Sequence, residues 1–184
     1  GFETMIAGNI GIPAFDHMEE VTPDTRIIFE LSCHQLEYMT VSPHIGILIN
    51  IHEEHLDHYG TMEKYVAAKQ HIYTNQKPGD LLICNMQCLP EPGSFAGDML
   101  TVCGDGSENG DVRILRTEDG AQVHFQDRVY TIQVNDIPLL GLHNYFNIGV
   151  AYAVCHRLGM EDTVFTEGLK TYKPLPDRLE FLGE

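Results

Sequence analysis

Short apolar runs, each followed by polar residues, dominate the first half of the chain. They cover residues 4–7, 25–29 and 45–49. Continuous apolar runs of this length are typical of strands buried on both faces, and therefore of a parallel sheet covered by helices. A helical pattern follows over residues 61–76. Thr61 suits the N-cap there, and an apolar stripe runs from Met62 to Tyr73.

The pattern changes after residues 78–79. One more buried strand is predicted at 81–84, and residues 88–110 are rich in Gly, Pro and acidic residues. The runs at 112–116, 123–125 and 129–134 are short and partly alternating, as in an antiparallel meander. Helical patterns return at 144–157 and 163–172. The predicted fold class is α/β, a mostly parallel sheet flanked by helices with a small antiparallel sheet attached, in one domain over residues 1–184.

The charge and the cysteines narrow the classes of function. The formal net charge is −16, which would repel a nucleic-acid backbone or an anionic membrane surface, so neither partner is expected. A polyphosphate would bind only with metal cations between the two sets of negative charge. The five cysteines are irregularly spaced without a C-x-x-C pair, which argues against disulfides and structural zinc. With no leader and no membrane-length apolar run, a cytoplasmic protein is expected.

Polar residues follow the predicted strands directly. Asn9, Glu30, Asn50, His52 and His55 each come just after an apolar run. Ligands of open parallel sheets bind at the carboxyl ends of the strands, so these side chains converge on one crevice if the strands are neighbours. A carboxylate such as Glu30 suits Mg²⁺, which prefers oxygen ligands. The same position also suits an N-cap or first-turn acid of the next helix.

Residues 50–59 contain three histidines and three carboxylates. His52, His55 and His58 are spaced three apart, whereas the zinc-protease pattern H-E-x-x-H requires four. A divalent-metal hydrolase using this His52–His58 cluster is one interpretation, and a solvated loop with surface histidines is the other. Lys69 follows two alanines on the predicted helix, and taken alone it indicates only a solvated charge.

Six short motifs occur in an order and spacing that resemble one known family. They are Gly-Asn-Ile-Gly at 8–11, Glu-Leu-Ser-x-x-Gln-Leu-Glu at 30–37, Asn-x-x-x-x-His-Leu-Asp at 50–57, Tyr-x-x-Ala-Lys at 65–69, Gly-Leu-His-Asn-Tyr-Phe-Asn at 141–147 and Leu-Pro-Asp-Arg-Leu-Glu at 175–180. The chain resembles the Mur ligases, ATP-dependent amide-forming enzymes of peptidoglycan synthesis. The resemblance implies their P-loop NTPase-like central domain.

The tail is most similar to the members that add D-glutamate to UDP-N-acetylmuramoyl-L-alanine, although those usually have His where Asp177 stands. Another Mur ligase or a folylpolyglutamate synthase-like amide ligase is the alternative within the superfamily. A catalytically inactive interaction module is a further alternative from a different class.

The resemblance also implies roles for individual residues. Glu30 would bind a Mg²⁺ ion shared with ATP, and His55 would hold a second Mg²⁺ together with a carbamylated Lys69. Carbamylation requires the neutral amine, which burial or neighbouring cations would favour. The other implied contacts are Asn9 and Ser32 with the UDP-linked muramoyl substrate, Asn144 and Asn147 with adenine, and Arg178 with a phosphate.

The implied chemistry has two steps, formation of an acyl phosphate from ATP and displacement of phosphate by the amine of D-glutamate. Metal ions would neutralise the two anionic reactants. The sequence contains no G-x-x-x-x-G-K-[ST] phosphate loop and neither of the family's flanking domains. The chain is therefore expected to be a fragment, incomplete at its N-terminus and inactive alone, of a full-length enzyme that is monomeric.

Overall fold

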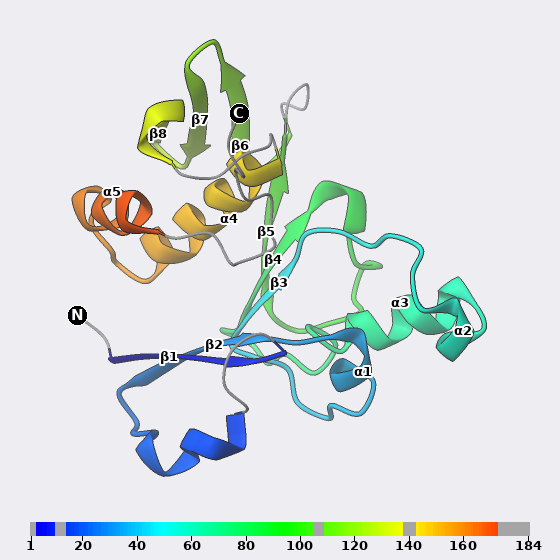
Figure 1. Cartoon of the computed structure of the whole chain (residues 1–184). Coiled ribbons are helices and arrows are strands. Elements are labelled where there is room, and N and C mark those ends of the chain that lie inside the picture. The colour runs from blue at the N-terminus through cyan, green and yellow to red at the C-terminus, as the bar shows by residue number, and fades with distance from the viewer. Residues whose placement is uncertain (1–2, 10–13, 105–108, 138–142, 173–184) are drawn as a thin grey trace, which may run out of the picture. The chain divides into compact units, whose positions relative to one another are not determined.

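The computed structural model describes residues 3–9, 14–104, 109–137 and 143–172 (Figure 1). The strands are β1 (Glu3–Gly8), β2 (Thr25–Glu30), β3 (Ile45–Leu48), β4 (Leu81–Asn85), β5 (Asp98–Cys103), β6 (Val112–Thr117), β7 (Gly120–Phe125) and β8 (Arg128–Gln133). The α-helices are α1 (Cys33–Leu36), α2 (Leu56–Tyr59), α3 (Met62–Gln70), α4 (His143–Arg157) and α5 (Asp162–Thr171), and 3₁₀ helices lie at Ala14–Glu20, Met86–Cys88 and Val134–Asp136. The strands form a two-stranded sheet, β1-β2, and a six-stranded sheet in the order β3-β4-β5-β6-β7-β8.

The chain divides into two compact units. The first comprises Gly1–Gly46, Ile51–Asp80 and Gly93–Gly97, and holds β1, β2 and helices α1 to α3. The second comprises Ile47–Asn50, Leu81–Pro92 and Asp98–Glu184, and holds strands β4 to β8 with α4 and α5. The chain passes from the first unit to the second within β3.

In the first unit, β1 and β2 pair in parallel, with Gly8 opposite Glu30 at their carboxyl ends. The strands predicted at 4–7 and 25–29 are therefore confirmed. Their predicted burial on both faces is wrong for this unit, because Ile6 is 65% and Ile28 59% exposed. Two strands alone bury little apolar surface, and a sheet normally needs a third strand or a packed helix to do so.

In the second unit, β4 is the buried strand that the sequence predicts, with Leu82, Ile83 and Cys84 fully buried. Strand β5, which is not predicted from the sequence, is parallel to both β4 and β6. The antiparallel pairs β6–β7 and β7–β8 are as predicted. They continue the parallel strands in one sheet instead of forming a separate small sheet. The β5–β6 junction, where the parallel strands meet the antiparallel ones, is the seam of the sheet. It is short, because β5 pairs with β6 at only two positions, Val102↔Val112 and Cys103↔Arg113.

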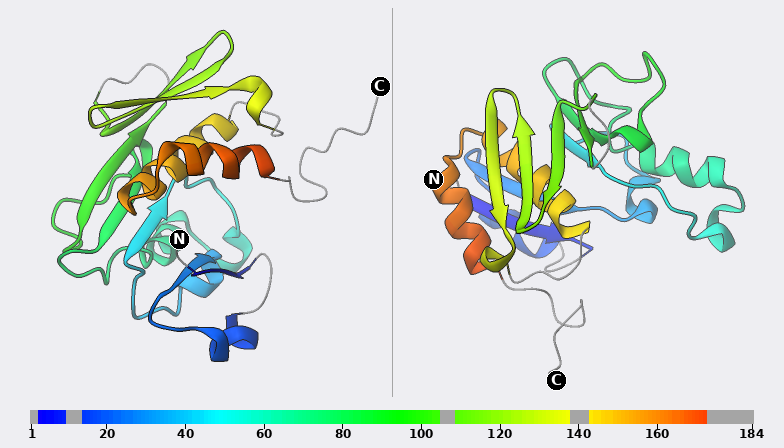
Figure 2. Two further views of the ribbon diagram at one scale, coloured as in Figure 1. Left: turned by 90° about the vertical axis from the view of Figure 1, so that its left-hand side faces the viewer. Right: turned by 90° about the horizontal axis from the view of Figure 1, so that it is seen from above.

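Helix α4 packs on β6 and β7, and α5 packs beside α4 (Figure 2). The helices predicted at 144–157 and 163–172 thus agree with the structure to within one residue. Tyr130 of β8 stacks on Tyr152 of α4 at 4.5 Å between ring centroids, and Phe165 of α5 meets both rings edge-on at 5.4 Å. Within the described ranges, every helix is too short or too polar to cross a bilayer.

Helix α3 is shorter than the predicted helix at 61–76. Its start is as predicted, because the Thr61 hydroxyl accepts the Lys64 N–H at 3.4 Å. It ends at Gln70, beyond which the His71 and Ile72 amides bond to carbonyls only three residues back. These tighter bonds turn the chain but leave Ile72 in the buried core, so the apolar stripe continues past the end of the helix.

Gly149, in the middle of α4, provides a test of this packing. A β-carbon at this position would lie 2.4 Å from Ile114 Cγ1 and 3.0 Å from Ile114 Cδ1. Gly149→Ala should therefore lower the free energy of unfolding by about 1–2 kcal/mol, since overpacking exceeds the gain in helix propensity. Urea unfolding would measure it. The control is Gly168→Ala in α5, where no atom lies within 4 Å of the added carbon, and this variant should be at least as stable as the native protein.

Candidate functional site

Asn9 and Glu30 lie side by side at the carboxyl ends of β1 and β2. The Asn9 amide donates to the Glu30 carbonyl at 3.0 Å. Gly8 makes this approach possible, because its φ is +121° and a β-carbon there would lie 2.1 Å from the Glu30 carbonyl oxygen. The predicted convergence of five residues on one crevice requires that their strands are neighbours, and this condition is not met for Asn50, which follows β3, a strand of the other sheet.

Ser32 caps α1. Its hydroxyl accepts the Gln35 N–H at 3.3 Å, and the Gln35 side-chain oxygen accepts the Ser32 N–H at 2.9 Å, which completes a capping box. Glu30 is the last residue of β2, so the N-cap interpretation of this acid is wrong. The short helix that Ser32 starts presents His34 and Glu37, three residues apart, on one face.

His55 has an unusual backbone conformation. It precedes α2 in the left-handed region, with φ 55° and ψ 28°, and its side chain makes no capping hydrogen bond. Apart from glycines, only Gln126 shares a positive φ among the described residues. Such residues cost on the order of 1–3 kcal/mol and cluster at functional sites. The His55 ring is half-exposed, with Nε2 3.9 Å from a Glu54 carboxylate oxygen.

Tyr65 of α3 is the common neighbour of His55 and Lys69. The Lys69 ammonium nitrogen lies 5.0 Å from the centroid of the Tyr65 ring, and the His55 ring lies 6.4 Å from the same ring. Tyr65 is almost fully buried, in a core cluster with Cys33, Tyr59 and Ala68. The structure thus places two of the three predicted metal-site residues around one fixed side chain. Glu30 belongs to the same unit, where its backbone carbonyl accepts the Asn9 amide.

Tyr59 belongs to the same buried cluster as Tyr65, which lies next to His55 and Lys69. Burial raises the pKa of its phenol well above the ordinary value, and the neighbouring Cys33 thiol raises it further. The phenol therefore stays neutral, and the His34 ring stacks on it at 5.6 Å. The buried cluster under the site is therefore uncharged. The ionisable side chains of the site lie along the exposed edge of this cluster, which we call the rim.

Histidines from separate segments gather at this rim. The His34 ring lies 5.0 Å from that of His55 and 4.7 Å from that of His58. Two groups have the spacing of metal ligands in the described residues, Cys33–His34–His55 and His34–Glu37–His58. Neither of these ligand groups includes His52, and both include His34 of α1. Residues 52–58 alone therefore do not supply either group. His34 is not predicted from the sequence, because its histidine partners lie on another segment.

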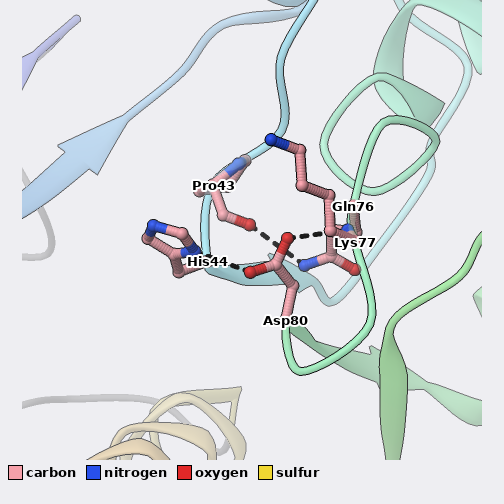
Figure 3. A network of polar contacts seen from close by, with 5 residues as sticks. All are labelled: Pro43, His44, Gln76, Lys77 and Asp80. Carbon is pink, nitrogen blue, oxygen red and sulfur yellow. Dashed lines mark hydrogen bonds and ion pairs between the residues drawn. The ribbon is translucent and has the colours of Figure 1, made fainter.

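Asp80 ties the end of the segment after α3 to the segment before β3 (Figure 3). Its carboxylate accepts the Lys77 N–H at 2.7 Å and lies 2.6 Å from His44 Nδ1. Beside it, the Gln76 side-chain amide donates to the Pro43 carbonyl at 3.1 Å. The hydrogen bond from His44, followed by that from Lys77, lowers the pKa of the Asp80 carboxyl. This network fixes the loop that connects the site helices to β4.

The lowered pKa of Asp80 predicts how stability depends on pH. The ionised carboxylate stabilises the fold above the unfolded-state pKa of about 3.9, and this contribution is lost as the pH falls through the lower folded-state pKa. Asp80→Asn should therefore reduce the free energy of unfolding at neutral pH, by a difference that shrinks on acidification below about pH 4. Denaturant unfolding at several pH values measures it. Asp98→Asn, which replaces an exposed carboxyl at the start of β5, is the matched control.

Asn144 and Asn147 lie three residues apart in the first turns of α4, in the second unit. Residues with this spacing share one face of a helix. Asn144 is partly buried and Asn147 exposed. Arg178 lies outside the described residues, so its predicted phosphate contact stays a prediction.

The sequence is similar to one protein family over most of its length. Residues 7–155 match the family model described as Mur ligase middle domain. The chain is 31% identical, over its whole length, to a UDP-N-acetylmuramoylalanine–D-glutamate ligase of Clostridium kluyveri, and covers 40% of that protein. It is 36% identical, over 96% of its length, to the enzyme so named from Lacticaseibacillus casei, and covers 38% of it. The chain thus spans about two fifths of the length of these relatives.

Solved structures show the same fold. MurF from Acinetobacter baumannii superposes with a TM-score of 0.73 at 21% identity, over all of this chain and 43% of that one. MurF ligase from Thermotoga maritima, solved in complex with ADP, gives a TM-score of 0.64 at 15% identity, over 95% of this chain and 50% of that one. The predicted fold class, α/β with a mostly parallel sheet flanked by helices, is confirmed.

Proposed function

Because the chain belongs to the Mur ligase middle-domain family, we propose that it is the ATP-handling part of a ligase that joins D-glutamate to UDP-N-acetylmuramoyl-L-alanine. The observation that carries this proposal is the similarity of essentially the whole chain to D-glutamate ligases at 31–36% identity. The local geometry supports this proposal, because Lys69 and His55, whose backbone is strained, both lie beside the Tyr65 ring. The acidic composition also fits a site whose substrates are held through cations.

The side chains present offer mainly oxygen ligands for magnesium, with the His55 nitrogen as an unusual ligand for this hard ion. Glu30 offers a carboxylate at a strand end, and His55 offers an imidazole at the exposed rim. The partly buried Lys69 lies against an aromatic face. We propose that its neutral amine adds to carbon dioxide and loses one proton, which makes a carbamate. This change replaces a cation that would repel Mg²⁺ with an oxygen ligand that binds it.

The proposed reaction requires two anions to approach each other. The muramoyl carboxylate attacks the γ-phosphorus of ATP, which gives an acyl phosphate and ADP, and the amine of D-glutamate then displaces phosphate. Magnesium ions supply charge neutralisation and in-line orientation in such transfers. In this proposal Glu30, His55 and Lys69 hold the ions, so their task is electrostatic positioning.

Substrate contacts are proposed at two further places. The T. maritima neighbour carries ADP, which supports a nucleotide role for this fold. We assign adenine contacts to Asn144 and Asn147, and a phosphate contact to Arg178. We assign the uridine-nucleotide substrate to Asn9 and Ser32. The Ser32 hydroxyl already takes part in the capping box, so it would contact a ligand as part of the α1 start.

The experiment that tests this function measures phosphate release by the full-length protein. UDP-N-acetylmuramoyl-L-alanine and ATP are supplied with D-glutamate, L-glutamate, L-lysine, meso-diaminopimelate or D-alanyl-D-alanine. We expect release and a new amide product, identified by mass, only with D-glutamate. Release driven by another amine would assign the chain to a different ligase of the superfamily, and so would release in a parallel assay with a folate substrate and L-glutamate.

A further inference from the structure

We propose that His34, Glu37 and His58 form a binding site for a divalent transition-metal ion of the Zn²⁺ type. This site goes beyond the proposed ligase function and uses none of the residues assigned to it. The three side chains each offer a ligand atom, and these atoms all lie within 4.8 Å of one another. They come from two short helices, α1 with its C-cap and α2.

The distances are close to those of a tetrahedral site. Zinc binds imidazole nitrogen and carboxylate oxygen at about 2.0–2.2 Å, which places neighbouring ligand atoms roughly 3.3 Å apart. His58 Nε2 lies 3.1 Å from Glu37 Oε2 in the structure. One edge of the site is therefore already formed, and the ligand atom of His34 lies within 4.8 Å of both its partners.

The backbone holds two of the ligands in place. The capping box of Ser32 and Gln35 fixes the start of α1, and the helical turn puts His34 and Glu37 on the same face. The His34 ring is also held against Tyr59, whose phenol is buried. Such preorganisation reduces the entropy that binding would otherwise remove.

The donor set selects the class of ion. Two imidazoles and one carboxylate suit Zn²⁺ and its neighbours in the transition series, whereas Mg²⁺ prefers oxygen ligands alone. The overlapping group Cys33–His34–His55 is a poorer site, because Cys33 is packed in the core with Tyr65 and Ala68. The side chains of His58 and Glu37 are 45% and 32% exposed, so an ion reaches them from solvent. Three protein ligands leave a fourth position for water.

The test is calorimetric titration of the full-length protein with ZnCl₂, in excess Mg²⁺ and without ATP or muramoyl substrate. The native protein should bind stoichiometric Zn²⁺. Loss of an outer-shell partner alone costs about 10–100-fold in affinity. His34→Gln, Glu37→Gln and His58→Gln should therefore each weaken binding by about tenfold or more. His52→Gln, a neighbouring exposed histidine outside both groups, should bind as the native protein does.

Two further measurements keep this result interpretable. Co²⁺ should give the visible absorption of a tetrahedral nitrogen–oxygen site, and Zn²⁺ should raise the melting temperature of the native protein but not of the His58→Gln variant. Native protein that binds Zn²⁺ no more tightly than His34→Gln does would overturn the proposal. So would binding that survives Glu37→Gln and His58→Gln but is lost in His55→Gln, since the ion would then belong to the Cys33 group. Neither outcome bears on D-glutamate ligation, which is measured separately.

Discussion

Lys69→Ala in the full-length protein is expected to lower kcat for D-glutamate-dependent phosphate release by about a hundredfold or more. Losing one preorganised electrostatic group at a charge-transferring site typically costs about 10²–10³. The reason lies in the proposed carbamate, without which the Mg²⁺ ion beside His55 loses an oxygen ligand. Steady-state kinetics with saturating substrates would measure the change.

Lys69→Arg separates the carbamate from a simple positive charge. Arginine keeps the charge but stays protonated, so it cannot take up carbon dioxide. We expect this variant to be as impaired as Lys69→Ala. Lys64→Ala removes an exposed lysine from the same helix and should leave kcat unchanged. High activity in Lys69→Arg would show that a cation suffices at this position and would rule out the carbamate.

Gly8→Ala is expected to lower the free energy of unfolding by about 3 kcal/mol or more, because strain and overpacking add at one position. The added β-carbon would lie 2.1 Å from the Glu30 carbonyl oxygen, at a φ of +121° that alanine rarely adopts. Either β1 moves away from β2 or the end of β2 shifts, and both changes displace Asn9 and Glu30. Ligase activity should therefore fall together with stability, as judged by denaturant unfolding and phosphate release.

Gly93→Ala is the matched control for that variant. Gly93 also has a positive φ, of +78°, but no atom lies within 4 Å of an added β-carbon. Its loss of stability should reflect backbone strain alone, about 1–3 kcal/mol. Equal losses in the two variants would mean that the close approach of Gly8 to Glu30 contributes nothing, contrary to the expectation.

The regular elements were readable from the sequence wherever the pattern was long or fully apolar. Strand β4 and helix α4 are examples, because burial on all sides or a repeated helical stripe leaves a strong signal. Strand β5 was missed because it begins with Asp98 and follows a Gly- and Pro-rich stretch. Helices α1 and α2 are four residues each, too short for a periodic pattern to be recognised.

The sequence predicted candidate residues for the site but not how they are arranged. Family motifs point to His55 and Lys69, and the structure brings both to Tyr65. Nothing in a single sequence predicts that a histidine adopts a positive φ, as His55 does. The proximity of His34 to His58 depends on how two helices pack, which spacing along the chain does not encode.

The seam between β5 and β6 makes the six-stranded sheet less rigid there than on either side of it. Only two residue pairs join the strands there, reinforced by the Asp111 carboxylate, which accepts from the Thr101 amide and hydroxyl at 2.7 Å. The β6–β8 ladder with its two helices has far denser internal bonding than this junction. Fluctuations should therefore concentrate where Val102 and Cys103 pair with Val112 and Arg113, so that β6–β8 with α4 and α5 moves as one body while the parallel strands keep their register.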